Sequence, residues 1–130
     1  MADFNKYVGV PYVEHGRDFN GCDCFGLVRL AMARELRIYL PDWRPDKHDM
    51  TGRHKAIQEH LDCFSRVDLP EVGDIGIFVF ESLPTHIGLY VGNGLLLHTL
   101  QGRQACIERL SSPLLRGRAR EWYRYSINSN

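Results

Sequence analysis

Apolar residues recur at the helical period of 3.6 in the segment 24–38, "CFGLVRLAMARELRI". The positions that carry this period are Leu27, Val28, Ala31, Met32 and Leu36. Asp23, directly before the segment, is a residue type that caps helix N-termini. The pattern therefore predicts a helix that begins at Cys24. After a loop with two prolines at 40–52, "RHKAIQEHLDCF" at 53–64 predicts a second, shorter helix.

The second half of the chain has the short apolar runs of β-strands, separated by spacers with glycine, proline or serine. The runs cover 75–80, 86–92, 95–100, 105–110 and 119–125. Because helices precede strands and do not alternate with them, the order favours an α+β fold over an α/β fold. We expect N-terminal helices packed on a central antiparallel β-sheet of about five strands, connected as a meander. A chain of 130 residues is the size of one domain, which we expect to span 1–130.

The turn "GNG" at 92–94 marks the clearest hairpin, and the length of its loop decides which side chains share a face. A three-residue loop pairs Val91 with Leu95 and places His86 and His98 on one face, within diagonal reach. A two-residue Asn-Gly loop would move His98 to the apolar face instead. Keeping that face apolar favours the three-residue loop, so we predict a histidine pair.

Charge and hydropathy exclude several classes of partner. Lysine plus arginine and aspartate plus glutamate both total 16, so no net field favours nucleic acid or an anionic membrane surface. No apolar run approaches the roughly 20 residues that span a bilayer. The start, "MADFNKYVGVPY", lacks the basic and apolar regions of a signal peptide. We expect no nucleic-acid partner, no membrane insertion and synthesis in the cytoplasm.

The four cysteines, at 22, 24, 63 and 106, have no regular spacing. C-x-C is a poor chelate spacing for zinc, so reduced thiols, no metal and no other cofactor are expected. Cys24 lies in the first turn of the predicted helix, where backbone N–H groups and the helix dipole stabilise a thiolate. A thiolate nucleophile needs a base and a third group that orients the base, and His86 and His98 fit these roles. Taken singly, each residue also fits an ordinary buried cysteine or core histidine.

Four sequence motifs, which follow one another along the chain, favour the catalytic interpretation of these residues over the ordinary one. "YVGVPYVEHG" opens the chain, "GCDCFGLV" surrounds Cys24, and "LPEVGDIGIF" and "HIGLYVGNGLLLHT" follow. Together they resemble the NlpC-type cysteine peptidases of bacterial and phage cell-wall metabolism, which have a papain-like fold. The resemblance implies that Cys24 is the nucleophile, His86 the general base and His98 the residue that orients it. It also implies that Tyr12 lines the oxyanion side of the site and that Asp23 both forms the site and supports it.

Two residues near the site depart from the family pattern. Phe25 replaces the small serine that usually follows the nucleophile, and His15 stands where a glycine is usual. A bulky residue after the cysteine resembles the variants of phage tails and predicts a narrowed or reshaped cleft. The role of Cys22 stays open between a passive neighbour and a thiol that closes on Cys24 under oxidation.

The resemblance implies a cysteine hydrolase that cuts amide bonds in peptidoglycan stem peptides, between D-glutamate and a diamino acid. It further implies association with a phage or prophage tail, tail proteins as partners, and a location in the virion tail or at the cell wall. Two alternatives remain at this stage. One is a non-enzymatic structural or assembly component of a tail, and the other is an amidase or acyltransferase that acts on another amide.

Overall fold

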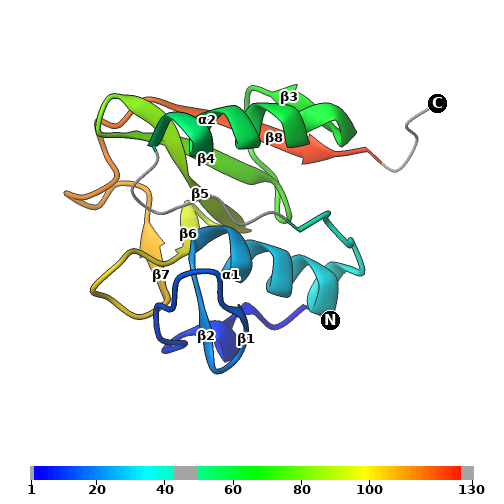
Figure 1. Cartoon of the computed structure of the whole chain (residues 1–130), viewed down its shortest axis with the longest axis vertical. Coiled ribbons are helices and arrows are strands. Elements are labelled where there is room, and N and C mark those ends of the chain that lie inside the picture. Colours follow the sequence, from blue (N-terminus) through cyan, green and yellow to red (C-terminus); the bar gives the residue numbers. More distant parts are fainter. Residues whose placement is uncertain (1, 43–49, 127–130) are drawn as a thin grey trace.

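The computed structural model describes residues 2–42 and 50–126 (Figure 1). The helical elements are η1 (Phe4–Tyr7), α1 (Cys24–Ala31), the π-helical turn η2 (Met32–Leu36), α2 (Met50–Glu59) and η3 (His60–Cys63). The strands are β1 (Arg17–Asp18), β2 (Gly21–Cys22), β3 (Phe64–Val67), β4 (Ile75–Phe80), β5 (Leu83–Gly92), β6 (Leu95–His98), β7 (Cys106–Arg109) and β8 (Arg120–Tyr125).

The main sheet has six strands in the order β3-β8-β4-β5-β6-β7, and all of its neighbouring strands are antiparallel. The α+β prediction is therefore confirmed, with one strand more than expected. The strands β4 to β7 form the predicted meander, but β8 pairs with β4 on the other side of the sheet. The meander prediction is wrong for this last strand, because pairing with β4 gives β8 two neighbours in place of an exposed edge.

The prediction of the second helix is wrong at its C-terminal end. The helix α2 ends at Glu59, a 3-10 turn follows, and the chain becomes extended as β3 from Phe64. Phe64 pairs with Tyr125 at the far end of the sequence, and their rings meet edge to face with centroids 5.6 Å apart. This contact between distant segments outweighs the local helical pattern. Of the predicted loop at 40–52, residues 43–49 lie outside the described residues, and 50–52 belong to α2.

The first predicted helix is present and slightly modified. The helix α1 begins at Cys24 as predicted and continues as the π-helical turn η2 to Leu36. Arg37, with φ 57°, then ends it in the left-handed conformation that commonly terminates helices. The apolar stripe of α1 is buried, and Leu27, Val28 and Ala31 have no exposed surface.

Two hydrophobic clusters lie on alternate sides of the strands. The larger cluster joins α1 and α2 to residues such as Ile77, Ile87 and Leu97 of the sheet. The smaller cluster contains Phe78 and Leu96, covered in part by Leu115 from the segment between β7 and β8. In Figure 1 the beginning of α1 lies beside β6, and α1 is in contact with both β5 and β6. The strands with the two histidines are thus neighbours of the cysteine helix.

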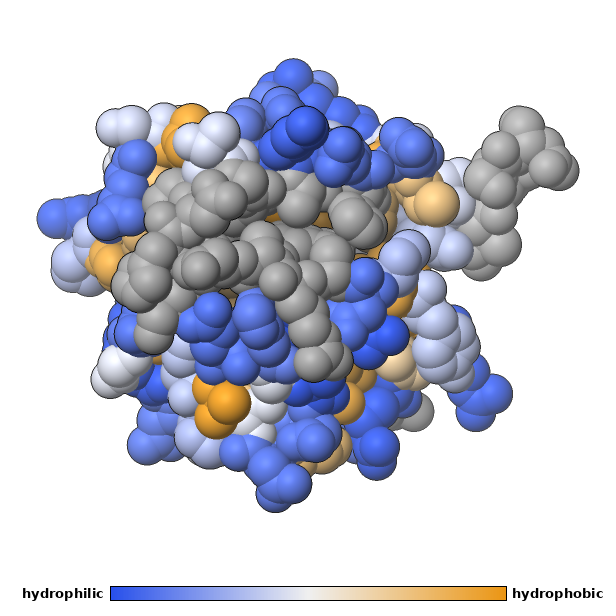
Figure 2. All heavy atoms as spheres, viewed as in Figure 1, coloured by the Kyte–Doolittle hydropathy of each residue, from blue (hydrophilic) through white to orange (hydrophobic). Residues whose placement is uncertain are grey.

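Outside the residues drawn in grey, the face of the molecule seen in Figure 2 is mostly hydrophilic, with small separate groups of apolar atoms. None of the helices in the described part of the chain has the length and apolarity needed to cross a membrane.

Candidate active site

Cys24 is the first residue of α1, and Asp23 caps the helix as the sequence predicts. The Asp23 backbone is extended, and its Oδ1 accepts the N–H of Gly26 at 2.8 Å. An N-cap carboxylate satisfies a helix-end donor and lies at the positive end of the helix dipole. Cys24 itself is only 9% exposed. The candidate nucleophile therefore lies at a capped helix start, with little exposed surface.

Asp23 also ties the preceding loop to this helix. Its Oδ1 accepts from Nη1 of Arg17 at 2.8 Å, and its Oδ2 accepts from the backbone N–H of His15 at 3.0 Å. The loop is so close that a Cβ on Gly26 would lie 2.0 Å from the carbonyl oxygen of Gly16. Asp23 thus holds the loop against the start of the helix, and its role in the site itself stays a prediction.

The backbone at His15 explains why glycine is the usual residue at this position of the family. His15 has φ 63°, in the left-handed region that favours glycine. The usual glycine of the family therefore fits the conformation better than histidine does. The backbone N–H of His15 still reaches Asp23, so the loop keeps its connection to α1.

Phe25 points into the protein interior. It is 7% exposed, belongs to the larger hydrophobic cluster and lines a small apolar cavity of about 30 Å³ together with Leu40 and Ile57. The guanidinium of Arg17 lies 5.4 Å from the centre of its ring. Phe25 therefore does not narrow the cleft, because its ring packs into the core between α1 and α2. A reshaped cleft, the other alternative, stays a prediction.

His86 and His98 are brought together as predicted. Nε2 of His86 lies 2.9 Å from Nδ1 of His98, and both side chains are buried. The pairs Leu89 with Leu97 and Tyr90 with Leu96 belong to the predicted register. The histidine pair of the sequence analysis is confirmed.

The loop that produces this register differs from the prediction. Gly92 pairs with Leu95, so the turn has two residues, Asn93 and Gly94, and both have positive φ. The register shifts between Tyr90 and Gly92, where Val91 forms a bulge. The prediction of a three-residue loop is wrong, and the extra residue of the bulge restores the register that a two-residue loop would have shifted.

Glu108, which the sequence analysis did not identify, is the other partner of His98. Its Oε1 lies 2.7 Å from Nε2 of His98. Burial lowers the pKa of His98, and contacts with Glu108 oppose this shift only in part. Burial alone would raise the pKa of Glu108, but hydrogen bonds from Ser112 and His98 and the charge of Arg103 lower it overall. The strand alternation could have identified Glu108, since a diagonal partner of His98 lies two residues beyond the residue opposite to it.

Aromatic side chains enclose His86. The ring of Phe80 lies 4.8 Å from the ring of His86, and that of Phe78 lies 6.2 Å away. The guanidinium of Arg118 covers Phe80 at 3.7 Å from the ring centre, and that of Arg120 lies 5.0 Å from the ring centre of Phe78. These contacts restrict the orientation of the imidazole.

Tyr12 lies beside the cysteine segment. It forms an isolated parallel bridge with Cys22, two residues before Cys24. It also lines an open depression of about 440 Å³ together with Pro11, Arg103 and Gln104. The structure therefore places Tyr12 near the start of α1, next to a surface that a substrate can reach.

Neither Cys22 nor Cys24 forms a disulfide bond in this structure. Cys22 has no exposed surface, and its Sγ–H donates to the carbonyl oxygen of Asp18 at 3.2 Å. Burial, with an added effect of the Asp23 charge, raises the pKa of Cys22 to about 12. A thiol in this environment stays protonated near neutral pH, which favours the passive role for Cys22.

One group of side chains in the described part of the chain has the donor atoms of a metal site. His98, Cys106 and Glu108 offer nitrogen, sulfur and oxygen ligands that all lie within 4.8 Å of one another. Such a mixed set suits a thiophilic divalent cation such as Zn²⁺. The same atoms already interact, since His98 is hydrogen-bonded to Glu108 and Arg103 lies 3.6 Å from the carboxylate.

Solved structures share this fold. An NlpC/P60 family protein from Bacillus cereus superimposes with a TM-score of 0.66 at 22% identity, over 94% of this chain and 37% of the other. The NlpC/p60 domain of the peptidoglycan hydrolase SagA gives 0.63 at 20% identity, over 91% and 90% of the two chains. The fold is therefore the papain-like α+β fold of this class of domains. The model of the NlpC/P60 family matches residues 9–123, and the chain belongs to that family.

Three curated relatives are similar in sequence. The gamma-DL-glutamyl hydrolase of Bacillus subtilis is 29% identical over 85% of this chain and 25% of its own length. The bifunctional muramidase/DL-endopeptidase CwlT of Bacillus subtilis is 33% identical over 76% and 28%. The murein DD-endopeptidase MepS/murein LD-carboxypeptidase of Escherichia coli is 26% identical over 93% and 58%. The chain thus spans between a quarter and just over half of the length of these relatives.

Proposed function

We propose that this chain is a cysteine hydrolase that cuts amide bonds in peptidoglycan stem peptides, at the bond between D-glutamate and a diamino acid. The observation that carries the proposal is the hydrogen-bonded pair of His86 and His98 on strands that contact the helix begun by Cys24. The names of the relatives supply the substrate class, since they are a gamma-DL-glutamyl hydrolase and murein or DL-endopeptidases.

The reaction we propose is acyl transfer to water. The thiolate of Cys24 attacks the amide carbonyl, and the oxyanion forms at the positive end of α1, on the side of Tyr12. His86 donates a proton to the leaving amine and then takes one from the water that hydrolyses the thioester. These steps release an amine and a carboxylate and restore the free thiol. His98 holds the imidazole of His86 in the orientation that both proton transfers need.

The charge near the site suits an acidic peptide. Arg103 lines the same depression as Tyr12, and its side chain is 45% exposed. A stem peptide that contains D-glutamate carries free carboxylates, for which a guanidinium is a good partner. Arg103 thus supports an anionic substrate over a neutral amide.

The test is an incubation of the purified protein with defined stem tripeptides and tetrapeptides, followed by mass spectrometry of the products. We expect a new N-terminal amine on the diamino acid, and none with Cys24→Ala. Cleavage at another bond would replace the D-glutamyl assignment, and transfer to an added amine would favour the acyltransferase alternative. No cleavage of any wall peptide, with Cys24 alkylated at the rate of an ordinary thiol, would contradict the hydrolase.

We further propose that the protein acts from a phage or prophage tail, with tail proteins as its partners. The support is Phe25, the bulky residue after the cysteine that resembles tail-associated variants. Mass spectrometry of purified virions tests this location. Detection of the chain at a fixed ratio to tail proteins is expected, whereas its absence from virions of an induced prophage would contradict the proposal.

A further inference from the structure

We propose that Glu108 is a positioning residue that sets the direction of the hydrogen bonds through His98 to His86, and so leaves Nδ1 of His86 as its basic nitrogen. The proposal rests on the roles proposed above for Cys24 and His86. It adds a fourth residue, on a third strand, to the three that the family resemblance implies.

The geometry forms a continuous chain across three adjacent strands. Glu108 on β7 contacts Nε2 of His98 on β6 at 2.7 Å, and Nδ1 of His98 contacts Nε2 of His86 on β5 at 2.9 Å. The β6 to β7 register pairs His98 with Cys106 and Leu96 with Glu108. Glu108 is therefore a diagonal neighbour of His98, which lets the carboxylate reach its ring. Both nitrogens of the buried His98 ring are used.

The carboxylate of Glu108, at one end of this series of hydrogen bonds, determines which ring nitrogens donate and which accept. An ionised carboxylate can only accept a hydrogen bond, and Oε1 of Glu108 lies 2.7 Å from Nε2 of His98. Nε2 of His98 must then carry the proton that it shares with Glu108. A neutral ring carries one proton only, so the proton of a neutral His98 lies on the nitrogen that faces the carboxylate. Nδ1 of His98 is left as an acceptor.

The same reasoning extends to His86. An acceptor at Nδ1 of His98 requires Nε2 of His86 to donate, so a neutral His86 ring carries its proton on Nε2. Its Nδ1 then has the lone pair that can take a proton from a thiol. The wrong tautomer of a catalytic histidine abolishes most activity in comparable triads. A carboxylate two steps away from the base can thus decide which nitrogen acts.

Other groups face this chain and bear on its pH dependence. Arg103 lies 3.6 Å from Oε1 of Glu108, and Sγ of Cys106 lies 4.0 Å from the same atom. Around His86 the neighbours are the rings of Phe78 and Phe80, with the charge of Arg118 behind Phe80. A merely structural Glu108 would hold Arg103 and the hairpin in place without any effect on the two histidine tautomers.

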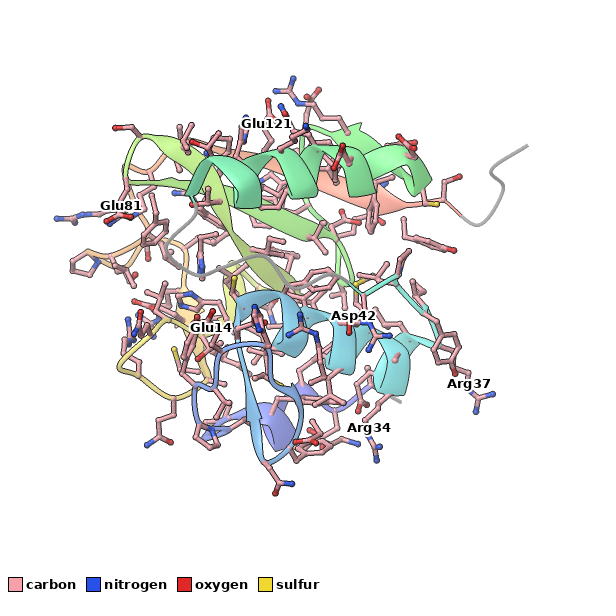
Figure 3. All side chains as sticks on the ribbon, viewed as in Figure 1. Glu14, Arg34, Arg37, Asp42, Glu81 and Glu121 are labelled. Atoms are coloured by element: carbon pink, nitrogen blue, oxygen red, sulfur yellow. The ribbon has the colours of Figure 1, made fainter. Side chains whose placement is uncertain are left out.

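The experiment compares the wild type with Glu108→Gln, Glu108→Asp and the control Glu121→Gln. Glu121 lies on β8, at the top of the view in Figure 3, and its side chain is 49% exposed. Nitrogen NMR of ¹⁵N-histidine reports the tautomer of each ring, and the pH profile of Cys24 alkylation reports the imidazolium. Neither measurement uses a stem peptide, so a wrong substrate would not affect the result.

We expect Nε2–H tautomers of His86 and His98 in the wild type, in Glu121→Gln and in Glu108→Asp. An amide can donate as well as accept, so Glu108→Gln should populate the other tautomer of both rings. Loss of the negative charge in Glu108→Gln also destabilises the imidazolium form of His86. The alkaline limb of the pH profile of Cys24 alkylation should therefore move to lower pH by roughly 0.5 to 1 unit.

Two results would overturn the proposal. One is a Glu108→Gln protein with unchanged tautomers and an unchanged alkylation profile. The other is a Glu108→Asp protein that loses the tautomers as completely as Glu108→Gln, because an acceptor-only carboxylate would then not be the cause. Thermal unfolding of each variant shows whether it is folded. If Glu108→Gln is not folded, the histidine tautomers of Glu108→Asp decide whether the proposal holds.

Discussion

Nε2 of His86 on β5 lies 2.9 Å from Nδ1 of His98 on β6. A two-residue turn joins these two strands, and β5 has a bulge just before it. Both rings are buried, at 4% and 1% exposure. A hydrogen bond between two buried rings fixes the orientation of each, because no water competes for the ring nitrogens. The pair therefore acts as one unit, and its parts can be tested separately.

Replacing His98 tests the orienting role. In His98→Leu the Nε2 atom of His86 loses its partner, and we expect kcat to fall on the order of 10²- to 10⁴-fold with little change in KM. His98→Gln keeps a hydrogen-bonding group and should recover part of the loss. Steady-state kinetics on the cleaved stem peptide measure both effects, and equal kcat in the leucine variant and the wild type would contradict the role.

Substitution of the two neighbouring cysteines, Cys22 and Cys24, should have clearly different effects on activity. Cys24→Ala should abolish turnover, whereas Cys22→Ala should keep most of the activity and lose about 1 kcal/mol of unfolding free energy from its buried site. Mass mapping of alkylated protein should find the label on Cys24 and not on Cys22, whose pKa is raised to about 12. A dead Cys22→Ala with an active Cys24→Ala would reverse the assignment.

Zinc should inhibit the enzyme through Cys106. A Zn²⁺ ion bound by His98, Cys106 and Glu108 would occupy Nε2 of His98 and break its bond to Glu108. We expect inhibition by Zn²⁺ that a chelator reverses, and Cys106→Ser should raise the half-inhibiting concentration by about tenfold or more. Cys63→Ser is the matched control, and equal zinc sensitivity in both variants would exclude this site.

Glycine at position 15 should stabilise the fold. His15 has φ 63°, which costs a side-chain-bearing residue roughly 1–2 kcal/mol, and glycine's greater freedom in the unfolded chain offsets part of the gain. We expect His15→Gly to raise the free energy of unfolding by about 0.5–1 kcal/mol. Arg34→Gly in the π-helical turn should lower it by a similar amount. Urea unfolding measures both, and a destabilised His15→Gly would mean that the histidine side chain contributes more than the strain costs.

Glu35 should make stability depend on acid pH. The hydroxyl of Tyr7, the N–H of Asp3 and the ammonium of Lys6 bond its carboxylate and lower its pKa to about 2. An unfolded glutamate has a pKa of about 4.3, so this stabilisation is complete above that pH and is lost as the pH falls toward about 2.

The matched comparison uses Glu35→Gln. The wild type should be the more stable protein near neutral pH, and the difference should shrink below about pH 4.3 and vanish near pH 2. Urea unfolding at a series of pH values gives the difference directly. A constant difference across this range would show that the carboxylate is not stabilised by ionisation.

Local sequence determined the beginning of the site. Capping chemistry at Asp23 and the apolar period after Cys24 placed the start of α1 at the observed residue, because both act within a few residues of each other. Alternation likewise located β4 at 75–80 and placed His86 and His98 on one face. These features depend on contacts that are short in sequence, and a single chain displays them directly.

Tertiary structure alone decided the rest. The strand β3 forms because Phe64 pairs with Tyr125 of β8. The strand β8 lies beside β4 because it pairs with the edge of β4 that β5 leaves open. The bulge at Val91 and the contact of Glu108 with His98 depend on which strands become neighbours. Pairing between distant segments has no local signature, since its free energy comes from burial and hydrogen bonds that exist only after the chain has folded. The sequence thus determined which residues could react, and the folded sheet decided which residues hold them.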